Sequence, residues 1–545
     1  MSKVAHYLQQ HLAGEVLTSP DVLRYFSTDE SILEIKPMLV VHPRSENDLR
    51  KAARFSWQLS ERGRIVPITI KGKGTDQTGA SLGSGIVLTT PAHLNKIIEL
   101  DQKSGVISAE AGANAGKIQQ TLLTHGRYLP SLTSAAEYST IGGSVANNDA
   151  GSSSYKYGPI REYVRGLRVV LSNGELIRTE RLSKREVSKK LGLASFEGEI
   201  YRSLDKLIEE SQETIESLSK LGIRNNSGYA IGDVKSKDGS IDLTPLLVGS
   251  QGTLGLISEV TLDTEAHPGQ SSVTVALFDD RTQAWLAVKE LNDMKEGPIS
   301  VDFVDRSLMQ YVQAENPNLV KSTLEGTVPT VALFIETEED GGRGSKKNGK
   351  KIAKILESAG ADIVKVTSDN LHNWMSLRDS SSVFLSHSKD QYRAVPIIDD
   401  AAIPPENCAN FVNKASELLE SYDLTEFAFW GQAGSGIIRA GVLFDLSQVG
   451  QRQKLFKLID EYYQLVVEAG GTIAASFAEG RLRATQADKV MSQEQVDLMQ
   501  RIKKIFDPHN MLNPGVKVAV DAETLKPLVR NEYTLDHQYS HLPRS

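Results

Sequence analysis

The stretch of residues 130–168 has the residue composition best suited to holding a ligand. Its sequence, PSLTSAAEYSTIGGSVANNDAGSSSYKYGPIREYVRGLR, is rich in Gly, Ser, Ala and Asn and has few long aliphatic side chains. Backbone with so few bulky side chains can approach a ligand closely and present its N–H groups in rows, which suits an anionic, phosphate-bearing molecule. Compact domains seldom contain structureless loops of this length. The stretch therefore indicates a cradle for a cofactor.

A second glycine-rich segment follows the expected strand 65–71. It reads GKGTDQTGASLGSG, and its glycines at 72, 74 and 79 lack the G-x-G-x-x-G spacing of a dinucleotide fold. No lysine follows a G-x-x-x-x-G pattern, which excludes the phosphate loop of nucleotide triphosphatases. We interpret the segment as a turn whose backbone N–H groups and Thr75 hydroxyl wrap a pyrophosphate. A third glycine-rich turn lies between two expected strands at residues 246–262, LLVGSQGTLGLISEVTL.

Length and charge restrict the class of protein. A chain of 545 residues exceeds what one hydrophobic core usually serves, so two or more domains are expected. Hydrophobic residues make up 40% and charged residues 24%, as in an ordinary globular protein. The net charge of -8 gives no electrostatic footprint for nucleic acid or anionic lipid. No nucleic-acid partner is therefore expected.

Cysteine content and hydropathy indicate the compartment. The single cysteine, Cys408, excludes an internal disulfide framework and a cysteine-based metal or iron–sulfur site within this chain. The N-terminal segment, MSKVAHYLQQHLAGEV, has no apolar run followed by a small-residue cleavage site, and no apolar run is long enough for a transmembrane segment. A cytoplasmic protein is expected, with peripheral membrane contact left open.

The remaining patterns predict the elements that position these loops. Helices are expected at 4–12, 49–62, 117–125 and 199–220, and strands at 38–42, 65–71, 86–89 and 105–109. Asn173-Gly174 predicts a hairpin over 167–178. Beyond residue 266 strands alternate with longer amphipathic helices, and 340–351, DGGRGSKKNGKK, is expected to be a solvated loop. The polar tail after residue 520 is expected on the surface or disordered.

Five segments, taken together and in order, resemble one family. They are KGKGTDQTG (71–79), STIGGSVANNDAGSSSYKYG (139–158), RNNSGYA (224–230), VGSQGTLGLISEVTL (248–262) and FDPHNMLNPGVK (506–517). The set resembles the vanillyl-alcohol-oxidase-type flavoproteins, also called PCMH-type FAD-binding proteins. Within them it is similar to the branch that contains D-lactate dehydrogenases and the glycolate oxidase D-subunit.

The resemblance implies an α+β fold with a two-lobed PCMH-type FAD-binding domain and an α+β cap domain. The implied division is a lead-in helix at 1–33, the FAD-binding domain at 34–265, the cap or substrate domain at 266–500, a return to the FAD domain at 501–519 and a polar tail at 520–545. The first loop contains no histidine, which relatives often use for covalent attachment, so non-covalent FAD is expected.

The resemblance also implies the residues that hold FAD. They come from the three glycine-rich loops and from the C-terminal return: Lys71, Gly72, Lys73, Gly74, Thr75, Asp76, Pro130, Thr140, Gly142, Gly143, Ser144, Asn147, Gly151, Gly252, Thr253, Gly255, Ile257 and Asn513.

For the substrate site, the resemblance holds only in part. Relatives pair an arginine in a W-x-x-x-R pattern with the substrate carboxylate, and Trp374 to Arg378 matches that pattern. Where relatives have G-H-x-G-D-G-N-L-H this chain has GQAGSGIIR (431–439), and where they have G-E-H-G it has ASFA (475–478). Gln432, Arg439 and Phe477 are not ligands that a divalent metal prefers, so no metal site is expected.

Candidate catalytic residues follow from these differences. Arg378 and Arg439 are candidates for binding an anionic small-molecule substrate, and Gln432 lies in the altered motif. Glu479, Tyr392, His387 and Lys389 are candidates for an acid or base, and no spacing singles one out.

Three functions remain open at this point. The first is an FAD-dependent oxidoreductase, a dehydrogenase or oxidase, which oxidises a small hydroxylated substrate, most simply a 2-hydroxy carboxylate, by hydride transfer to flavin N5 without a metal. The second is a low-activity or regulatory FAD-binding subunit that needs a partner protein for turnover. The third is a binding module without flavin. The sequence leaves open whether dioxygen, a quinone or an acceptor protein reoxidises the flavin.

Overall fold

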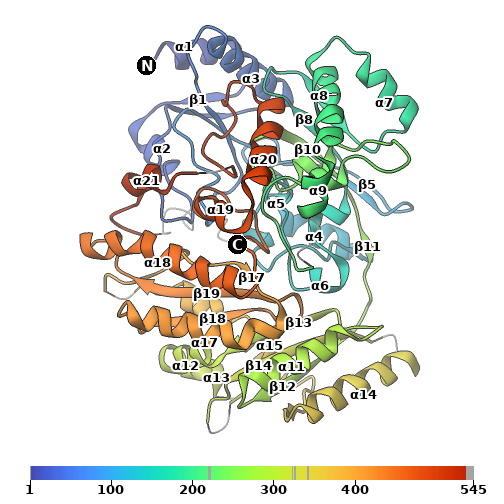
Figure 1. Cartoon of the computed structure of the whole chain (residues 1–545), viewed down its shortest axis with the longest axis vertical. Helices are drawn as coiled ribbons and strands as arrows, with labels where there is room; N and C mark the ends of the chain where they lie inside the picture. Colours follow the sequence, from blue (N-terminus) through green and yellow to red (C-terminus); the bar gives the residue numbers. More distant parts are fainter. Residues whose placement is uncertain are drawn as a thin grey trace.

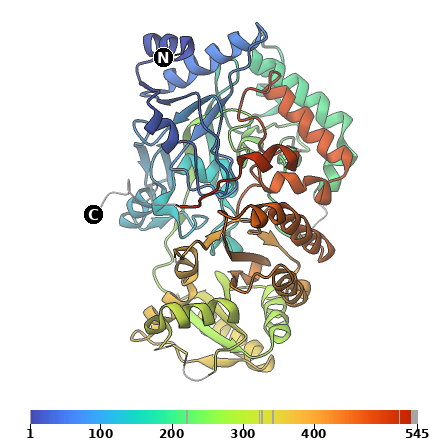
Figure 2. The same cartoon turned by 90° about the vertical axis from the view of Figure 1, so that its left-hand side faces the viewer.

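The computed structural model describes residues 2–218, 222–321, 323–324, 327–339, 343–388, 390–518 and 520–534. Two lobes that contain the N-terminal half of the chain lie above a larger sheet domain built mainly from residues beyond 270 (Figure 1). A quarter turn shows the same division into an upper two-lobed part and a lower part (Figure 2). Within the described residues, no helix combines the length and the apolar composition that crossing a bilayer requires.

The first lobe is a small sheet covered by helices. Its strands are β1 (Glu15–Leu17), β2 (Leu39–His42), β4 (Ile86–Thr89) and β3 (Ile68–Lys71), in that spatial order. Strands β2, β4 and β3 run parallel, and β1 pairs antiparallel with β2. The helices are α1 (Lys3–His11), α2 (Pro20–Tyr25) and α3 (Glu46–Ser60). Leu49 and Ala53 of α3 pack with Val41 and Leu88 in one buried core, which fixes the end of β3, where the first glycine loop begins.

The second lobe is an antiparallel sheet with helices on it. Its strands are β5 (Ile97–Asp101), β6 (Val106–Glu110), β10 (Leu256–Asp263), β8 (Val164–Val170) and β9 (Leu176–Thr179), in that order, and β7 (Arg127–Tyr128) pairs with β11 (Glu265–Ala266) nearby. The helices from this part of the chain are α4 (Ala115–Thr124), α5 (Ile141–Asn147), α6 (Ser154–Tyr157), α7 (Lys184–Leu191), α8 (Phe196–Glu210), α9 (Gln212–Leu218) and α10 (Thr244–Leu247). Helix α20 (Gln493–Phe506) returns from the end of the chain, and its Met499, Ile502 and Phe506 are buried in the core of this lobe.

The lower domain is an antiparallel sheet with helices on both faces. Its strand order is β15 (Asp362–Val364), β12 (Ser271–Phe278), β14 (Val331–Glu338), β13 (Ser300–Asp305), β18 (Phe427–Gln432), β19 (Ile437–Phe444) and β16 (Arg393–Val395), and β17 (Ala401–Ala402) also pairs with β19. Helices α11 (Arg281–Asn292), α14 (Arg343–Ser358), α17 (Pro405–Ser421) and α18 (Val449–Glu468) cover one face. Helices α12 (Arg306–Glu315), α13 (Pro317–Val320), α15 (Leu371–Arg378) and α16 (Ser381–Leu385) cover the other.

Some expected elements differ in the structure. The prediction of a solvated loop at 340–351 is wrong from residue 343 on, because α14 begins there; residues 340–342 lie outside the described residues. Ile352 and Leu356, one turn apart, are buried against the sheet, and this burial stabilises a helix whose start is very polar. The expected helix at 199–220 is two helices, α8 and α9, which meet at Ser211; residues 219 and 220 lie outside the described part.

The C-terminal segment is not simply a surface tail. Helix α19 (Ala487–Val490) precedes α20, and α21 (Ala522–Leu525) comes after the stretch that follows α20. Leu525 and Tyr533 are buried in the same core as residues of the lower sheet, and the Tyr533 hydroxyl donates to the Glu30 carbonyl at 2.7 Å. Residues 520–534 therefore fasten the lower domain to the first lobe, and residues 535–545 lie outside the described chain.

Candidate functional site

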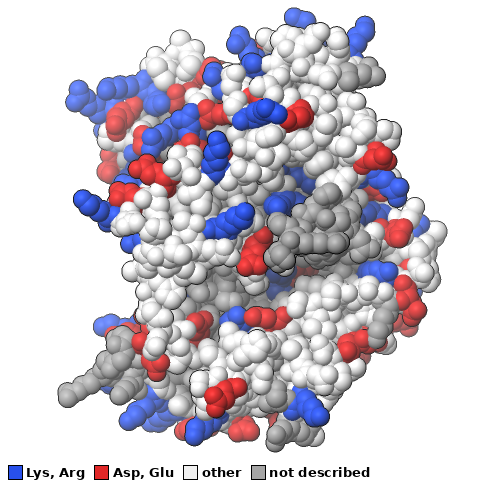
Figure 3. Space-filling view, turned by 180° about the vertical axis from the view of Figure 1, so that it is seen from behind, with Lys and Arg blue, Asp and Glu red and all other residues white. Residues whose placement is uncertain are grey.

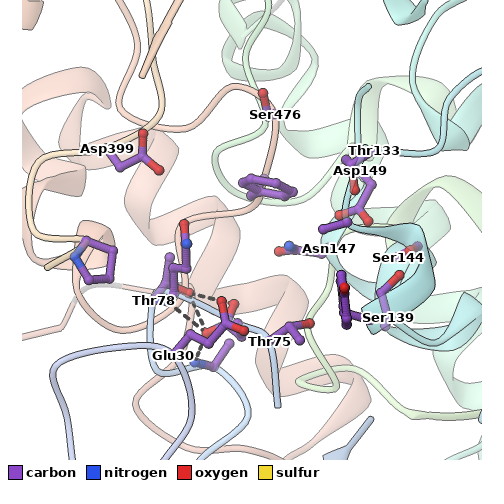
Figure 4. A pocket seen from close by; sticks show the side chains of 18 of the residues that line it. Glu30, Thr75, Thr78, Thr133, Ser139, Ser144, Asn147, Asp149, Asp399 and Ser476 are labelled. Atoms are coloured by element: carbon purple, nitrogen blue, oxygen red, sulfur yellow. Dashed lines mark hydrogen bonds between the residues drawn. The ribbon is translucent and has the colours of Figure 1, made fainter. Parts of the chain in front are cut away.

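A cavity of about 910 Å³ lies where the two lobes meet the lower domain. In Figure 3 the surface is hollowed at this level, between the lobes above and the sheet domain below. All three glycine-rich loops line the cavity, together with residues of α15, α16, β13, β18 and β19. In Figure 4, Glu30 and Thr78 lie on one side of it and Ser139 and Ser144 on the other.

The first loop, residues 72–79, leaves β3 and folds around the side chain of Asp76. The Asp76 carboxylate accepts hydrogen bonds from the backbone N–H groups of Thr78 at 2.9 Å and Ala80 at 2.7 Å. Gly74 and Gly79 have φ of +80° and +82°, in the left-handed region that favours glycine. The loop is thus held by its own carboxylate, and its residues 72–76 face the cavity.

The second loop contains α5 and the turn that follows it. The Thr140 hydroxyl caps α5 by accepting from the Gly143 N–H at 3.2 Å. A Cβ on Gly142 would lie 2.6 Å from Ala111, and one on Gly151 would lie 2.1 Å from the Leu132 carbonyl oxygen. These two glycines are required by packing. A Cβ on Gly143 would approach one atom within 4 Å outside the backbone of its own helix, the Thr140 hydroxyl at 3.0 Å. The absence of a side chain at Gly143 therefore leaves space in the cavity and is not needed for close packing of the core.

Several buried polar atoms on the cavity wall lack a partner within the described protein. They are the hydroxyls of Ser144 and Ser476, Asp149 Oδ1, Asp302 Oδ2 and Gln432 Oε1. A buried polar group without a hydrogen bond costs about 1–3 kcal/mol. This wall, glycine-lined and rich in unpaired hydrogen-bonding atoms, fits a large polar ligand such as a dinucleotide cofactor.

Most of the residues predicted to hold the cofactor line the cavity, and the exceptions are Lys71, Pro130, Thr253 and Asn513. Asn513 donates to the carbonyls of Ala80 at 2.7 Å and Gln251 at 2.8 Å, so it ties the first and third glycine loops together from behind. The Thr253 hydroxyl bonds the Ser250 carbonyl and Tyr229, and Pro130 is buried. These residues support the wall from outside it.

Lys71 is also buried behind the first loop. Its Nζ donates to the Thr28 carbonyl at 2.7 Å. Desolvation lowers its pKa to about 8, against the opposing charges of Asp29 and Asp76.

Arg378 reaches the cavity from the end of α15. Its Nε and Nη2 donate to the two oxygens of Asp379 at 2.9 and 3.2 Å, and its Nη1 lies 3.9 Å from Asp302 Oδ2. Its side chain is 22% exposed, so part of the guanidinium is open to the cavity. The edge of the guanidinium formed by Nε and Nη2 is occupied by Asp379, and the edge formed by the two terminal nitrogens remains available to an anion.

Arg439 is held differently, by β19 and its neighbours. Its Nε donates to Asp399 Oδ1 at 2.7 Å, its Nη2 donates to Asp399 Oδ2 and to Gln77, and the guanidinium lies 5.1 Å from the Phe477 ring centre. The bidentate carboxylate compensates most of its charge. Arg439 lines the cavity, but its geometry favours a role in joining β19 to the first loop over binding a substrate anion.

Behind Arg439 lies a buried ion pair. Asp400 accepts from the N–H groups of Ser476 at 2.7 Å and Phe477 at 2.9 Å, and Arg483 contacts it at 2.8 Å. Burial raises the pKa of Asp400, but the Arg483 and Arg439 charges and these N–H donors outweigh burial and leave the pKa lowered. The pair fixes the 475–478 loop against the cavity.

Gln432 lies at the contact between the lower sheet and the cradle. Its Nε2 donates to the Ala150 carbonyl at 3.1 Å, and its Oε1 is one of the unpaired atoms described above. The structure thus brings together Arg378, Arg439 and Gln432 from separate strands and helices.

The structure does not bring Glu479, His387 or Tyr392 to the cavity. Glu479 Oε2 lies 2.7 Å from Lys517 Nζ, with side chains 1% and 0% exposed. His387 is hydrogen-bonded to the Tyr311 hydroxyl, and Tyr392 is 44% exposed on the surface. Lys389 lies outside the described residues.

Two regions of the chain match known protein families. Residues 37–180 match the family described as FAD binding domain, and residues 267–516 match the family described as FAD linked oxidases, C-terminal domain. The chain belongs to the FAD-linked oxidases. The predicted α+β fold class, its PCMH-type likeness and FAD as the cofactor are confirmed. Non-covalent attachment of the FAD stays a prediction.

The relatives of this chain include proteins named for hydroxy acids. It is 26% identical over 523 residues to a D-2-hydroxyglutarate dehydrogenase of Escherichia coli (strain K12), covering 93% of this chain and 50% of that one. The chain thus spans about half the length of that curated relative. It is 26% identical over 489 residues to glycolate oxidase subunit GlcD of Bacillus subtilis (strain 168), covering 89% and 90%. A crystal structure of p-cresol methylhydroxylase shares the fold, with a TM-score of 0.67, 15% identity, and coverage of 96% and 97%.

Sequence patterns missed three carboxyl groups that line the cavity: Asp149 and Asp302, which are buried, and Glu30, which is half-buried. Burial raises the pKa of Glu30 to about 8, that of Asp149 to about 7 and that of Asp302 to about 7. Asp149 lies within the 139–158 segment but was not singled out there, and Glu30 and Asp302 lie outside all five family segments. The available signal was a charged residue inside an apolar strand pattern, as at Asp302 in ISVDFV.

For Glu479 we expect a loss of stability rather than of chemistry. Glu479→Gln would leave Lys517 buried without a counter-charge, which costs about 3–5 kcal/mol. The thermal midpoint of the flavin-free protein should fall by several degrees. Glu523→Gln, in an exposed ion pair with Lys526, is the matched control and should change the midpoint little. An unchanged midpoint for Glu479→Gln, with loss of flavin reduction, would return Glu479 to the catalytic candidates.

Proposed function

We propose that this chain is an FAD-dependent dehydrogenase or oxidase that oxidises a small hydroxylated substrate, a 2-hydroxy carboxylate, by hydride transfer to the flavin. The observation that supports it is the presence of the Arg378 guanidinium and the glycine-lined cradle on the wall of one cavity. Relatives that act, by name, on D-2-hydroxyglutarate and glycolate support the substrate class.

FAD would be held by the three glycine loops. In the proposed arrangement the N–H groups of residues 72–76 and the Thr75 hydroxyl bind the pyrophosphate, and the unpaired Ser144 hydroxyl and Asp149 oxygen provide further contacts. FAD, when bound, accepts a hydride at N5 of its ring system. The residues around the cavity orient the substrate and exclude water.

Arg378 would bind the carboxylate of the substrate. Its outer N–H groups form a planar fork that matches a carboxylate, and Asp379 holds the opposite edge so that the guanidinium keeps its orientation. This fixes the hydroxyl-bearing carbon relative to the cradle, which is the main contribution of positioning to the rate.

We further propose that turnover needs no metal. Gln432, Arg439 and Phe477 stand where related hydroxy-acid dehydrogenases are expected to have metal-binding side chains, and amide, guanidinium and phenyl groups are poor partners for a divalent cation. Among the residues that the structure describes, no three His, Cys, Asp or Glu side chains lie close enough together to hold one. Dialysis against EDTA should therefore leave the rate of flavin reduction unchanged, and a loss restored by Zn²⁺ or Mn²⁺ would contradict this.

The first test is the visible spectrum of the purified chain and its response to substrates. We expect an oxidised flavin spectrum that is bleached anaerobically by at least one of D-2-hydroxyglutarate, D-lactate and glycolate. Acid precipitation should release the flavin, as non-covalent binding requires. A flavin spectrum that no hydroxy acid bleaches would favour the alternative below, and the absence of flavin would contradict the proposal.

The alternative is a low-activity or regulatory FAD-binding subunit that requires a partner protein. Two observations favour keeping it: one relative is named a subunit, and the chain spans half the length of another.

The proposal also includes the electron acceptor, which is a quinone or a protein, and a cytoplasmic location with peripheral membrane contact left open. It further includes the domain division at 34–265, 266–500 and 501–519, in which the packing of α20 favours an earlier start of the C-terminal return, at Gln493.

A further inference from the structure

Asp302 lies on the central strand β13, where the lower sheet meets the cradle. The neighbouring contacts define this place: Gln432 of the adjoining strand β18 bonds Ala150, and Asn292 joins Tyr155 of α6 at 2.7 Å to the Gly434 carbonyl at 2.9 Å. The carboxyl of Asp302 therefore reaches the cavity between the residues proposed to hold FAD and Arg378.

The Asp302 carboxyl is buried but incompletely bonded. Asp302 is 5% exposed, and its Oδ2 has no hydrogen-bond donor within the described residues. Its nearest charge is Arg378 Nη1 at 3.9 Å, beyond hydrogen-bond distance. A buried carboxylate oxygen that points into a cavity without a donor indicates that a ligand supplies one.

Among the described carboxylates on the cavity wall, Asp302 and Asp379 lie within 4 Å of Arg378, and of these two only Asp302 has an oxygen without a donor. Both carboxylate oxygens of Asp379 accept hydrogen bonds from the Arg378 guanidinium. Asp302 faces the other side of the same guanidinium with an open oxygen. A substrate whose carboxylate binds Arg378 has its hydroxyl one carbon away, so the hydroxyl lies within reach of the Asp302 side.

We propose that Asp302 is the base that accepts the substrate hydroxyl proton, an assignment that rests on the proposed function. The O–H bond breaks and its proton goes to Asp302 Oδ2, while the electron pair of that bond forms the carbonyl. The hydrogen on the same carbon leaves with its bonding pair to the oxidised flavin, which gains two electrons. Asp302 then returns its proton to solvent, so a 2-oxo acid is the product.

The electrostatics of the site suit this role. Burial raises the pKa of Asp302 to about 7, opposed by the Arg378 charge and a hydrogen bond from the Ser152 hydroxyl, with Glu336 and Asp379 adding to the rise. A base with a pKa near the working pH is the most effective in general base catalysis. The base form prevails above about pH 7, so flavin reduction should rise with pH through that range.

The test compares the wild type with Asp302→Asn in anaerobic stopped-flow reduction by the hydroxy acid that bleaches the flavin. Asp302→Asn should bind FAD normally, reduce at least about 100-fold more slowly and lose the rise near pH 7. Asp302→Glu should keep that rise. The control is Asp362→Asn, on the exposed edge strand of the same sheet, which should behave as wild type. Wild-type rates and pH dependence in Asp302→Asn would overturn the assignment.

A second measurement does not depend on turnover. Oxalate binding is followed by calorimetry in two buffers of different ionisation enthalpy near pH 7. An anion on Arg378 raises the proton affinity of Asp302, so the wild type should take up a fraction of a proton and Asp302→Asn none. Equal proton uptake by both, or no oxalate binding, would overturn the proposal. If no hydroxy acid reduces the flavin of the wild type but proton uptake on oxalate binding depends on Asp302, the proposed function is wrong. The assignment of Asp302 as a proton-accepting group beside Arg378 then still holds.

Discussion

Replacing Gly143 with leucine is expected to give a folded protein that no longer retains FAD. Gly143 lies on the cavity wall in α5, and a Cβ there would lie 3.0 Å from the Thr140 hydroxyl, so the added carbon requires a small shift of that side chain and meets no core backbone. The rest of the leucine side chain would occupy the space proposed for the cofactor. Leucine is also a better helix former than glycine, by roughly 1 kcal/mol, so the helix itself should not suffer.

The measurement is the flavin content per chain, followed by titration of the flavin-free protein with FAD. We expect at least a 100-fold weaker affinity with an unchanged thermal midpoint in the flavin-free form. Gly450→Leu, at an exposed helical glycine with no atom within 4 Å, is the matched control and should retain FAD. If Gly143→Leu binds FAD as well as the wild type, the cofactor does not lie against α5.

Arg378→Ala is expected to lower kcat/KM for a hydroxy acid by about 100- to 1,000-fold. Removing one partner of a desolvated charge pair costs about 3–4 kcal/mol in transition-state binding, which corresponds to that range. FAD content should be unchanged, because the three glycine loops do not depend on this side chain. Arg378→Lys should recover only part of the loss, since an ammonium cannot pair with a carboxylate through two parallel hydrogen bonds.

The informative comparison is between substrates with and without a carboxylate. A neutral alcohol that reduces the flavin slowly should react equally with wild type and Arg378→Ala. Arg393→Ala is the control in the same domain, because Arg393 donates to the carbonyls of Asp390 and Tyr392 away from the cavity. Equal kcat/KM for a hydroxy acid in wild type and Arg378→Ala would mean that another group binds the carboxylate.

Much of this protein could be predicted from local sequence. The Asn173-Gly174 turn was predicted between two strands, and β8 and β9 flank it with Gly174 at a φ of +85°. The family and the cofactor followed from glycine loops, because a loop that approaches a phosphate needs residues without bulky side chains in a fixed order. Such requirements lie within a few adjacent residues, so the sequence by itself determined the fold class and the glycine-rich loops that line the cavity.

Tertiary structure alone decided the rest of the site. Glu479 is paired with Lys517, 38 residues away, which removes it from the cavity. Asp302 becomes an acid–base candidate because β13 places it beside Arg378, which lies in a separate helix, and because burial changes its proton affinity. Burial and charge pairing depend on which distant segments fold together, and no local spacing records them. The glycine-rich cradle can therefore be predicted from the sequence. Which acid and base groups lie beside the cradle is decided by the packing of distant segments.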